Sequence, residues 1–253
     1  MALGASALAA LCSGGLLLLA SPAGREAESE EEGLRRALTW LCYPPVLIAT
    51  SSGTTDVVLA PMLIGVVLLW RRPAATSALI TAAGWFKLAP FALLPLCLAA
   101  RRGGQLARSG LAAISVSVPL VVLLVVLGGL DGPIRMLHAM SFQFTRGTPQ
   151  SAWAALGLNA WQPIAQALAI GLVVAGAVRL RLASEAAPAQ IAALSAAILL
   201  ALQLAANYWS FLYVVWFVPL LTLALFSGTP EAVAWPVELR MRGVTPAIVP
   251  VEA

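Results

Sequence analysis

The chain has 253 residues, of which 60% are hydrophobic and 10% are charged, and its formal net charge is +4. Soluble domains carry about 25% charged residues, so this composition excludes an ordinary soluble domain and predicts an integral membrane protein. The arginines cluster at the ends of apolar runs, where basic residues mark membrane topology rather than affinity for nucleic acid. One histidine and three cysteines without a Cys-x-x-Cys pair exclude a multi-histidine centre and suggest no zinc site.

The first apolar run, 2–20, is followed by Ser21-Pro22-Ala23, which would suit the cleavage site of a signal peptide. No basic segment precedes the run, and the rest of the chain is equally hydrophobic, so we favour a retained transmembrane helix. The next segment, 25–36, is rich in glutamate and arginine and is expected outside the bilayer. Residues 1–37 are therefore predicted to form a first transmembrane helix and a charged cytoplasmic segment.

Further apolar runs predict an all-α, polytopic transmembrane bundle over residues 38–226. These runs are 38–50, 57–70, 74–100, 110–130, 164–178, 189–206 and 211–226. The longest polar stretch between them, 131–163, is expected to be an external loop with a short interfacial helix, because apolar side chains recur there at helical spacing from Ile134 to Phe144. Residues 227–253 contain several prolines and are expected to be a cytoplasmic tail.

The run 74–100 contains Lys87, the one lysine of the chain, and decides the predicted topology. As a single helix, this run would place seven arginines on each side of the membrane. As a hairpin that turns at residues 87–90, it would gather twelve arginines on one side and leave Lys87, Arg135 and Arg146 on the other. Cytoplasmic loops carry such an excess of arginine, and Pro90 disfavours a continuous helix. The sequence therefore predicts a short re-entrant-like hairpin with Lys87 at its external tip.

This topology gathers polar residues on the non-cytoplasmic side of the membrane. They are the turn 51–56 with Asp56, Lys87, the loop residues His138 and Arg146, and the segment 207–209 with Tyr208. An ionisable side chain at membrane depth costs about 2.5–3.5 kcal/mol and is a functional candidate by default. Lys87 could form a structural ion pair with Asp56, extend to the interface, or bind an anion, because a compact ammonium suits a phosphate.

The other candidates have structural alternatives as well. Asp56 or Thr55 could cap the apolar helix that follows, and His138 could be an ordinary residue of an interfacial helix. Arg146 precedes Gly147-Thr148-Pro149, a turn signal, and could be either a solvated loop charge or a second phosphate contact. The aromatic residues between 208 and 216 could form a belt at the membrane interface.

Three segments together resemble the C-terminal half of GT-C glycosyltransferases, in particular the bacterial polyprenyl-phosphate-mannose-dependent mannosyltransferase-like proteins. Members of that family have a small-residue turn that ends in Asp before an apolar helix, then a Lys-x-x-Pro hairpin, then a tyrosine-rich helix end. The matching positions here are Asp56, Lys87 with Pro90, and Tyr208 with Tyr213. The matching segments are YPPVLIATSSGTTDVVLAPMLIGVVLLWRR (43–72), AAGWFKLAPFALLPLCLAARR (82–102) and NYWSFLYVVWFVPLLTLAL (207–225).

The resemblance implies mannosyl or hexosyl transfer from a polyprenyl-phosphate sugar to a glycan or lipid acceptor on the external face of the cell membrane. The lipid phosphate would lie near Lys87, with Arg146, His138 and Tyr208 as further binding residues, and Asp56 would be the candidate catalytic carboxylate. Neither a metal nor a cofactor is expected, because the donor is the lipid-linked sugar itself. Membrane lipid is the expected surrounding, and nucleic acid is not an expected partner.

One departure from the family pattern concerns the catalytic acid. GT-C enzymes carry it in a large external loop near the N-terminus, whereas the acids from Glu26 to Glu32 fall on the predicted cytoplasmic side. We therefore expect an N-terminally truncated or split enzyme, with a separate N-terminal half or partner subunit. The alternatives are a transporter or flippase-like protein, in which Lys87 and Asp56 line a substrate path, and a non-catalytic membrane subunit. Transporters usually have paired broken helices, and the sequence indicates one broken segment, at 87–90.

Overall fold

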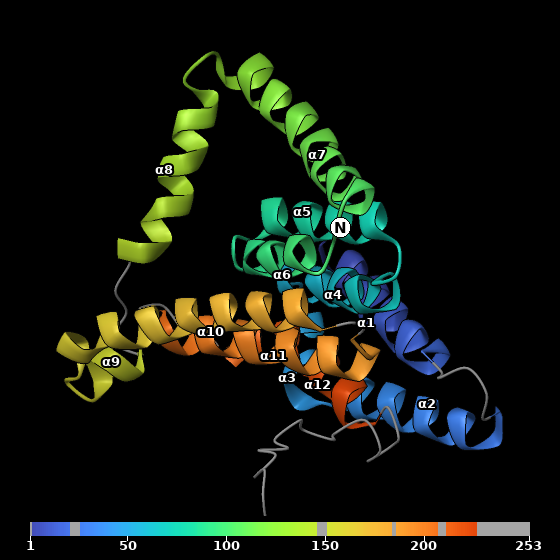
Figure 1. Cartoon of the computed structure of the whole chain (residues 1–253). Coiled ribbons are helices and arrows are strands. Elements are labelled where there is room, and N and C mark those ends of the chain that lie inside the picture. The colour runs from blue at the N-terminus through green and yellow to red at the C-terminus, as the bar shows by residue number, and fades with distance from the viewer. Residues whose placement is uncertain (1, 21–25, 146–150, 184–185, 207–210, 227–253) are drawn as a thin grey trace, which may run out of the picture.

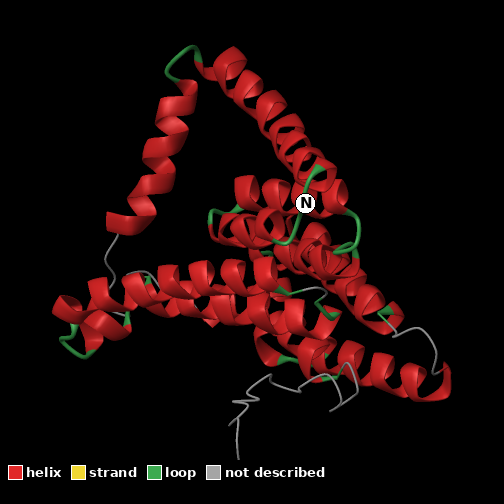
Figure 2. Cartoon of the chain, in the orientation of Figure 1, coloured by secondary structure: helices red, strands yellow, loops and turns green. Residues whose placement is uncertain are grey.

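The computed structural model describes residues 2–20, 26–145, 151–183, 186–206 and 211–226. Within these ranges the chain forms helices joined by turns and has no strand (Figure 2), which confirms the all-α prediction. The helices are α1 (Ala2–Leu19), α2 (Glu26–Leu41), α3 (Pro44–Ser51), η1 (Thr55–Val58), α4 (Leu59–Leu68), α5 (Pro73–Phe86), η2 (Ala89–Leu93), α6 (Leu94–Ala99), α7 (Gly104–Gly128), α8 (Gly132–Thr145), α9 (Ala152–Ala155), η3 (Asn159–Trp161), α10 (Gln162–Leu182), α11 (Pro188–Ala205), η4 (Phe211–Tyr213) and α12 (Val214–Leu225).

Four helices of the described chain are long and apolar enough to cross a membrane, which agrees with the prediction of a multi-pass membrane protein. They are α1, α7, α11, and α10 together with η3. A fifth span results if α3 is combined with η1 and α4, although this pair is bent by 117°. The apolar runs predicted at 110–130, 164–178 and 189–206 correspond to α7, α10 and α11.

The hydrophobic core lies where α1, α4, α11 and α12 meet, with α2 and α3 packed beside them. Its fully buried side chains include Leu17, Trp40, Leu59, Leu63, Ile64, Ile198, Leu199, Val215 and Leu220. Trp40 on α2 donates its indole N–H to the carbonyl of Ala10 on α1 at 3.0 Å, because a buried donor needs an acceptor. This core fixes α4 and α12 relative to each other; the site described below uses a residue of α12 and a residue of η1, the short helix that leads into α4.

The predicted run 74–100 is broken into α5, η2 and α6 rather than forming one helix. Lys87 has extended backbone angles, φ −147° and ψ 133°, directly after α5. Pro90 has no N–H to donate to the carbonyl of Phe86, and its ring would clash with that carbonyl in a continuous helix. The chain then turns back, so that η2 and α6 pack against α5. This close approach needs Gly84, where a Cβ would lie 2.6 Å from the ring of Phe91.

A second break, between α3 and η1, falls at the turn expected between the apolar runs 38–50 and 57–70, but its sharp bend of 117° was not predicted. Gly53 has φ 65°, in the left-handed region that favours glycine, and a Cβ there would lie 3.3 Å from the backbone nitrogen of Leu3. Ser6 on α1 also donates its hydroxyl to the carbonyl of Thr54 at 2.7 Å. Contacts with α1 therefore hold the chain in this bend.

Helices α7 and α8 project from the bundle and form two sides of an open triangle (Figure 1). The first half of α7 packs against α5, where Ser77 donates to the carbonyl of Ser109 at 2.7 Å and Trp85 donates to the hydroxyl of Ser117 at 2.9 Å. Helix α8 follows after a short turn, contacts the end of α7 beside that turn, and then diverges from it (Figure 1). The helix expected from the spacing between Ile134 and Phe144 is therefore present, and it stands apart from α4 and α5 (Figure 1).

Candidate ion-pair site at the two helix breaks

Asp56 lies in the first turn after the α3–η1 break, where a threonine holds both its backbone and its side chain. The hydroxyl of Thr54 accepts a hydrogen bond from the backbone N–H of Asp56 at 3.4 Å and donates one to Oδ2 of Asp56 at 2.8 Å. Thr54 is thus the residue that caps η1, whereas the sequence suggested Thr55 or Asp56 for this role. The cap leaves the carboxylate of Asp56 directed toward the break between α5 and η2.

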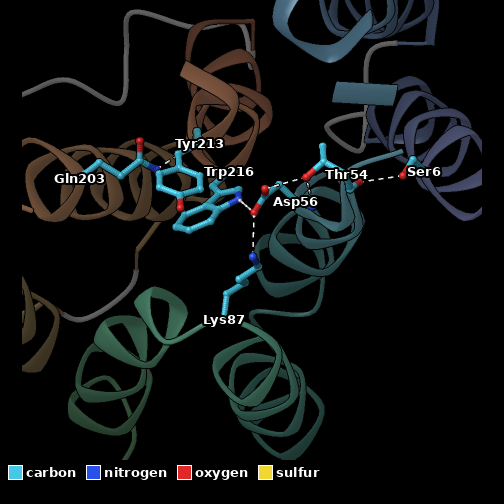
Figure 3. A network of polar contacts seen from close by, with 7 residues as sticks. All are labelled: Ser6, Thr54, Asp56, Lys87, Gln203, Tyr213 and Trp216. Atoms are coloured by element: carbon cyan, nitrogen blue, oxygen red, sulfur yellow. Dashed lines mark hydrogen bonds and ion pairs between the residues drawn. The ribbon is translucent and has the colours of Figure 1, made fainter. Parts of the chain in front are cut away.

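Lys87 forms an ion pair with Asp56 across the two helix breaks (Figure 3). The Nζ atom of Lys87 lies 3.2 Å from Oδ1 of Asp56. The two partners differ in access, because the side chain of Lys87 is 33% exposed and that of Asp56 is 9% exposed. The structural ion pair that the sequence left as one alternative is therefore formed, and its more accessible member is the cation.

A tryptophan completes the set of donors around Asp56. Trp216 on α12 donates its indole N–H to Oδ1 of Asp56 at 3.2 Å. Its ring stacks on the ring of Tyr213, with centroids 4.5 Å apart and an interplanar angle of 28°. Gln203 on α11 holds the same turn by donating to the carbonyl of Tyr213 at 2.9 Å (Figure 3). The carboxylate thus accepts hydrogen bonds from Thr54 and Trp216 and forms an ion pair with Lys87.

The arrangement favours an anion-binding role over a proton-transfer role. An ammonium has three N–H donors, and among the described residues Asp56 is the ion-pair partner of Lys87. The remaining donors can serve a ligand that approaches the exposed part of Lys87. Asp56 is buried and its carboxylate already contacts Thr54, Trp216 and Lys87, so a ligand reaches Lys87 more readily than it reaches Asp56.

The predicted site residues do not all come together. Lys87 and Asp56 are in contact, whereas His138 belongs to α8, which stands away from both breaks (Figure 1). Arg146 and Tyr208 lie outside the described residues. Within the described chain, no group of three or more His, Cys, Asp and Glu side chains comes together in a way that could hold a metal ion.

Sequence reasoning missed the roles of Thr54, Trp216 and Gln203. Trp216 was grouped with an aromatic belt, although an indole N–H in an apolar helix needs a hydrogen-bond acceptor. That requirement is the signal that could have linked Trp216 to one of the few acceptors in the membrane region.

Comparison with known proteins gives no relative from which a function could be carried over. No protein-family model matches the chain, and comparisons with curated proteins and with solved structures give no significant match.

Proposed function

We propose that the chain is a membrane glycosyltransferase of the GT-C type, or the C-terminal portion of one. It transfers a mannosyl or other hexosyl group from a polyprenyl-phosphate sugar to a glycan or lipid acceptor on the external face of the membrane. The observation that carries the proposal is the partly exposed ammonium of Lys87, held by the buried Asp56 where two broken helices meet.

A lipid-linked phosphate suits this ammonium. When the glycosidic bond breaks, the leaving phosphate gains negative charge, and a cation fixed at that position stabilises the transition state more than the ground state. Asp56 acts as a positioning residue that keeps Nζ of Lys87 at the break. Because the Lys87 pair is bordered by apolar helices, a phosphate attached to a polyprenyl chain can reach it while the chain remains in the hydrocarbon region.

The proposed topology has a re-entrant hairpin over α5, η2 and α6, with Lys87 at its external tip. It is supported by a contact between the two ends of this segment, since the guanidinium of Arg101 lies 4.9 Å from the ring centroid of Trp70. That contact brings the arginines at 71–72 and 101–102 to one end of the bundle, as the hairpin requires. The proposed external loop is 131–163, and the proposed tail 227–253 is cytoplasmic.

Only two of the predicted site residues carry this proposal. They are Lys87, as the phosphate ligand, and Asp56, which positions it. Arg146 and Tyr208 are not described, and His138 lies on the projecting α8.

The direct test is sugar transfer in membranes that contain the chain. Membranes with the wild-type chain, given a radiolabelled polyprenyl-phosphate sugar, should transfer label to an acceptor. Lys87→Gln should abolish transfer, whereas Lys87→Arg should retain part of it, because the charge remains but the compact ammonium is lost. Arg135→Gln is the matched control, since Arg135 is a cation on α8 that donates to the carbonyl of Gly128. Absence of transfer by the wild type, or full transfer by Lys87→Gln, would contradict the proposal.

One observation favours a second candidate, a transporter. The bend of 117° between α3 and α4 faces the break at Lys87, so the described chain contains two broken segments joined by an ion pair. Transporters bind substrates at such paired breaks. A cysteine in place of the exposed Thr55 distinguishes a transporter from the proposed enzyme. A transporter that alternates its access exposes it to reagents from both sides of the membrane, whereas the proposed enzyme exposes it from one side.

A further inference from the structure

Arginines from three separate segments meet at one end of the bundle and form what we call the arginine cluster. They are Arg71 and Arg72 between α4 and α5, Arg101 and Arg102 between α6 and α7, and Arg181 in the last turn of α10. This cluster is independent of the ion pair between Lys87 and Asp56.

Direct contacts hold the three segments together. The buried guanidinium of Arg101 lies over the ring of Trp70 and donates to the carbonyl of that residue. Arg181 donates to the carbonyl of Arg101 at 2.9 Å, and Arg102 donates to the carbonyl of Arg181 at 3.0 Å. Each bond joins a guanidinium to a backbone carbonyl rather than to a carboxylate, so the positive charges converge without being neutralised by these contacts.

The described carboxylates lie elsewhere. They are Asp56, Asp131 and the glutamates of α2, and α2 packs against α1, α3 and α12. In the described part of the chain, no ion pair involves any member of the cluster. Arg71, Arg72, Arg102 and Arg181 are exposed, whereas Arg101 is 7% exposed. The cluster therefore presents four accessible cations on a base fixed by Arg101 and Trp70.

The cluster lies at the ends of two candidate membrane spans. Helix α7 begins just after Arg102, at Gly104, and α10 ends just after Arg181, at Leu182. This places the charges at a membrane boundary, at the depth of phospholipid phosphates, whichever way the protein is oriented. Exposed apolar side chains continue from the cluster along both spans; they are Leu106, Leu111 and Ile114 on α7, and Val174, Val178 and Leu182 on α10.

We propose that the arginine cluster binds the phosphate headgroup of an anionic phospholipid, whose acyl chains lie along the exposed apolar side chains of α7 and α10. A guanidinium has a planar set of donors that matches phosphate oxygens. Basic pockets between transmembrane helices recognise anionic headgroups by this chemistry. The apolar spans beside the cluster distinguish this ligand from a soluble anion, which would have no use for them.

The test uses the full chain, purified in detergent and mixed with equimolar phosphatidylglycerol and phosphatidylcholine of the same acyl length. Native mass spectrometry counts the lipid that remains bound. The wild type should retain phosphatidylglycerol over phosphatidylcholine. Arg71→Gln with Arg72→Gln should weaken that preference, since each arginine near an anionic surface is worth about a fivefold change in affinity. Arg102→Gln with Arg181→Gln should weaken it further.

Arg35→Gln is the matched control, because Arg35 is also exposed but pairs with Glu31 at 2.6 Å; it should leave lipid preference unchanged. Arg102 and Arg181 also hold the segments together. In the described chain, the side chains of Arg71 and Arg72 make no such bond between segments, so the variant at these two positions decides the outcome if the other does not fold. Equal retention of the two lipids by the wild type would overturn the proposal. The same is true if Arg35→Gln reduces the preference as much as the variant at Arg71 and Arg72.

Discussion

The carboxylate of Asp56 is held by side chains from three parts of the chain that are distant in sequence. Thr54 caps η1, Lys87 follows α5, and Trp216 lies on α12. A buried carboxylate is costly unless its oxygens are paired, so these three donors make its burial possible. In return, the carboxylate fixes the position of the Lys87 ammonium. The pair is therefore expected to contribute to stability as well as to ligand binding.

A double-mutant cycle tests this coupling. Asp56→Asn should lower the free energy of unfolding by about 1–3 kcal/mol, because it leaves a partly buried ammonium without its charge partner. Lys87→Met should also destabilise, because Asp56 is then left without its cation. The double variant should lose less than the sum of the two single variants. Thermal unfolding in detergent measures all three.

Asp131→Asn is the control for the loss of a carboxylate, because Asp131 is exposed between α7 and α8. It should change the unfolding midpoint little. Strictly additive effects of Asp56→Asn and Lys87→Met would show that the two side chains do not interact as the 3.2 Å separation implies.

At the residue scale, the sequence offered the ion pair as one of three alternatives for Lys87 and did not predict its surroundings. The chain has one lysine, and one aspartate lies beside a polar turn, so few side chains could neutralise either charge. Their pairing could therefore be considered from the sequence. The contribution of Trp216 depends on how α12 crosses α4, which is a tertiary contact that no local pattern specifies.

At the element scale, the return of η2 onto α5 depends on one close approach. Gly84 lies against the ring of Phe91, which in turn meets Trp85 in an edge-to-face contact with centroids 6.1 Å apart. These contacts join α5 and η2, the two arms of the hairpin on either side of the Lys87 turn. The position of Lys87 relative to Asp56 should therefore depend on how closely the arms approach each other.

Gly84→Ala tests this dependence. The new Cβ would lie 2.6 Å from the Phe91 ring, so the ring or the backbone must move, and we expect a loss of about 1–3 kcal/mol in the free energy of unfolding. Gly110→Ala on α7 is the matched control, since a Cβ there meets nothing within 4 Å. That control should be neutral or stabilising by about 0.5–1 kcal/mol, because glycine is a poor residue in a helix interior.

Unfolding midpoints of the two variants in detergent give the comparison. Equal effects of Gly84→Ala and Gly110→Ala would mean that the arms do not approach as closely as the Gly84–Phe91 contact requires. Adding Phe91→Leu to Gly84→Ala should recover part of the loss, since the smaller side chain makes room for the new methyl group.

The two breaks differ in how far the sequence could predict them. Pro90 removes a backbone donor, which is a local and unconditional effect, so the end of α5 near Phe86 could be expected. The bend at Gly53 depends on contacts with Leu3 and Ser6 on α1. A Ser-Gly-Thr turn between two apolar runs reads equally well as a simple loop, and only the packing of α1 turns it into a sharp bend.

At the scale of the whole molecule, the path of the chain through the membrane is set by α7. This helix has 25 residues, or roughly 37 Å at 1.5 Å per residue, which is enough to cross a bilayer. If α7 crosses the membrane, its two ends lie on opposite sides, and α5 begins on the same side as α7 if α5, η2 and α6 form a hairpin.

Cysteine labelling in intact cells tests this path. In a background with Cys12→Ser and Cys42→Ser, cysteines at the exposed positions Ala74 and Gln105 should react from the same side of the membrane. A cysteine at Asp131 should react from the opposite side. Cys97 is buried, so its labelling would report that the protein has unfolded. Labelling of Ala74→Cys and Gln105→Cys from opposite sides would rule out the hairpin.

The all-α class and the long apolar helices α7, α10 and α11 could be predicted from composition and apolar runs, because a bilayer requires long apolar helices. The placement of α8 could not. The topology put His138 on the same membrane face as Lys87, but a shared face does not imply contact. Helix α8 stands apart because it starts from the far end of α7, which leaves the bundle after its first half (Figure 1).

The proposed role of Lys87 is that its ammonium binds the phosphate of a polyprenyl lipid. It is tested most directly by measuring the binding of polyprenyl phosphate and of the uncharged polyprenol to the purified chain, by native mass spectrometry. We predict that the wild type retains the phosphate and releases the alcohol, and that Lys87→Gln, shown to be folded by its unfolding transition, loses this preference. Equal retention of the two lipids by the wild type, or an unchanged preference in folded Lys87→Gln, would contradict the claim.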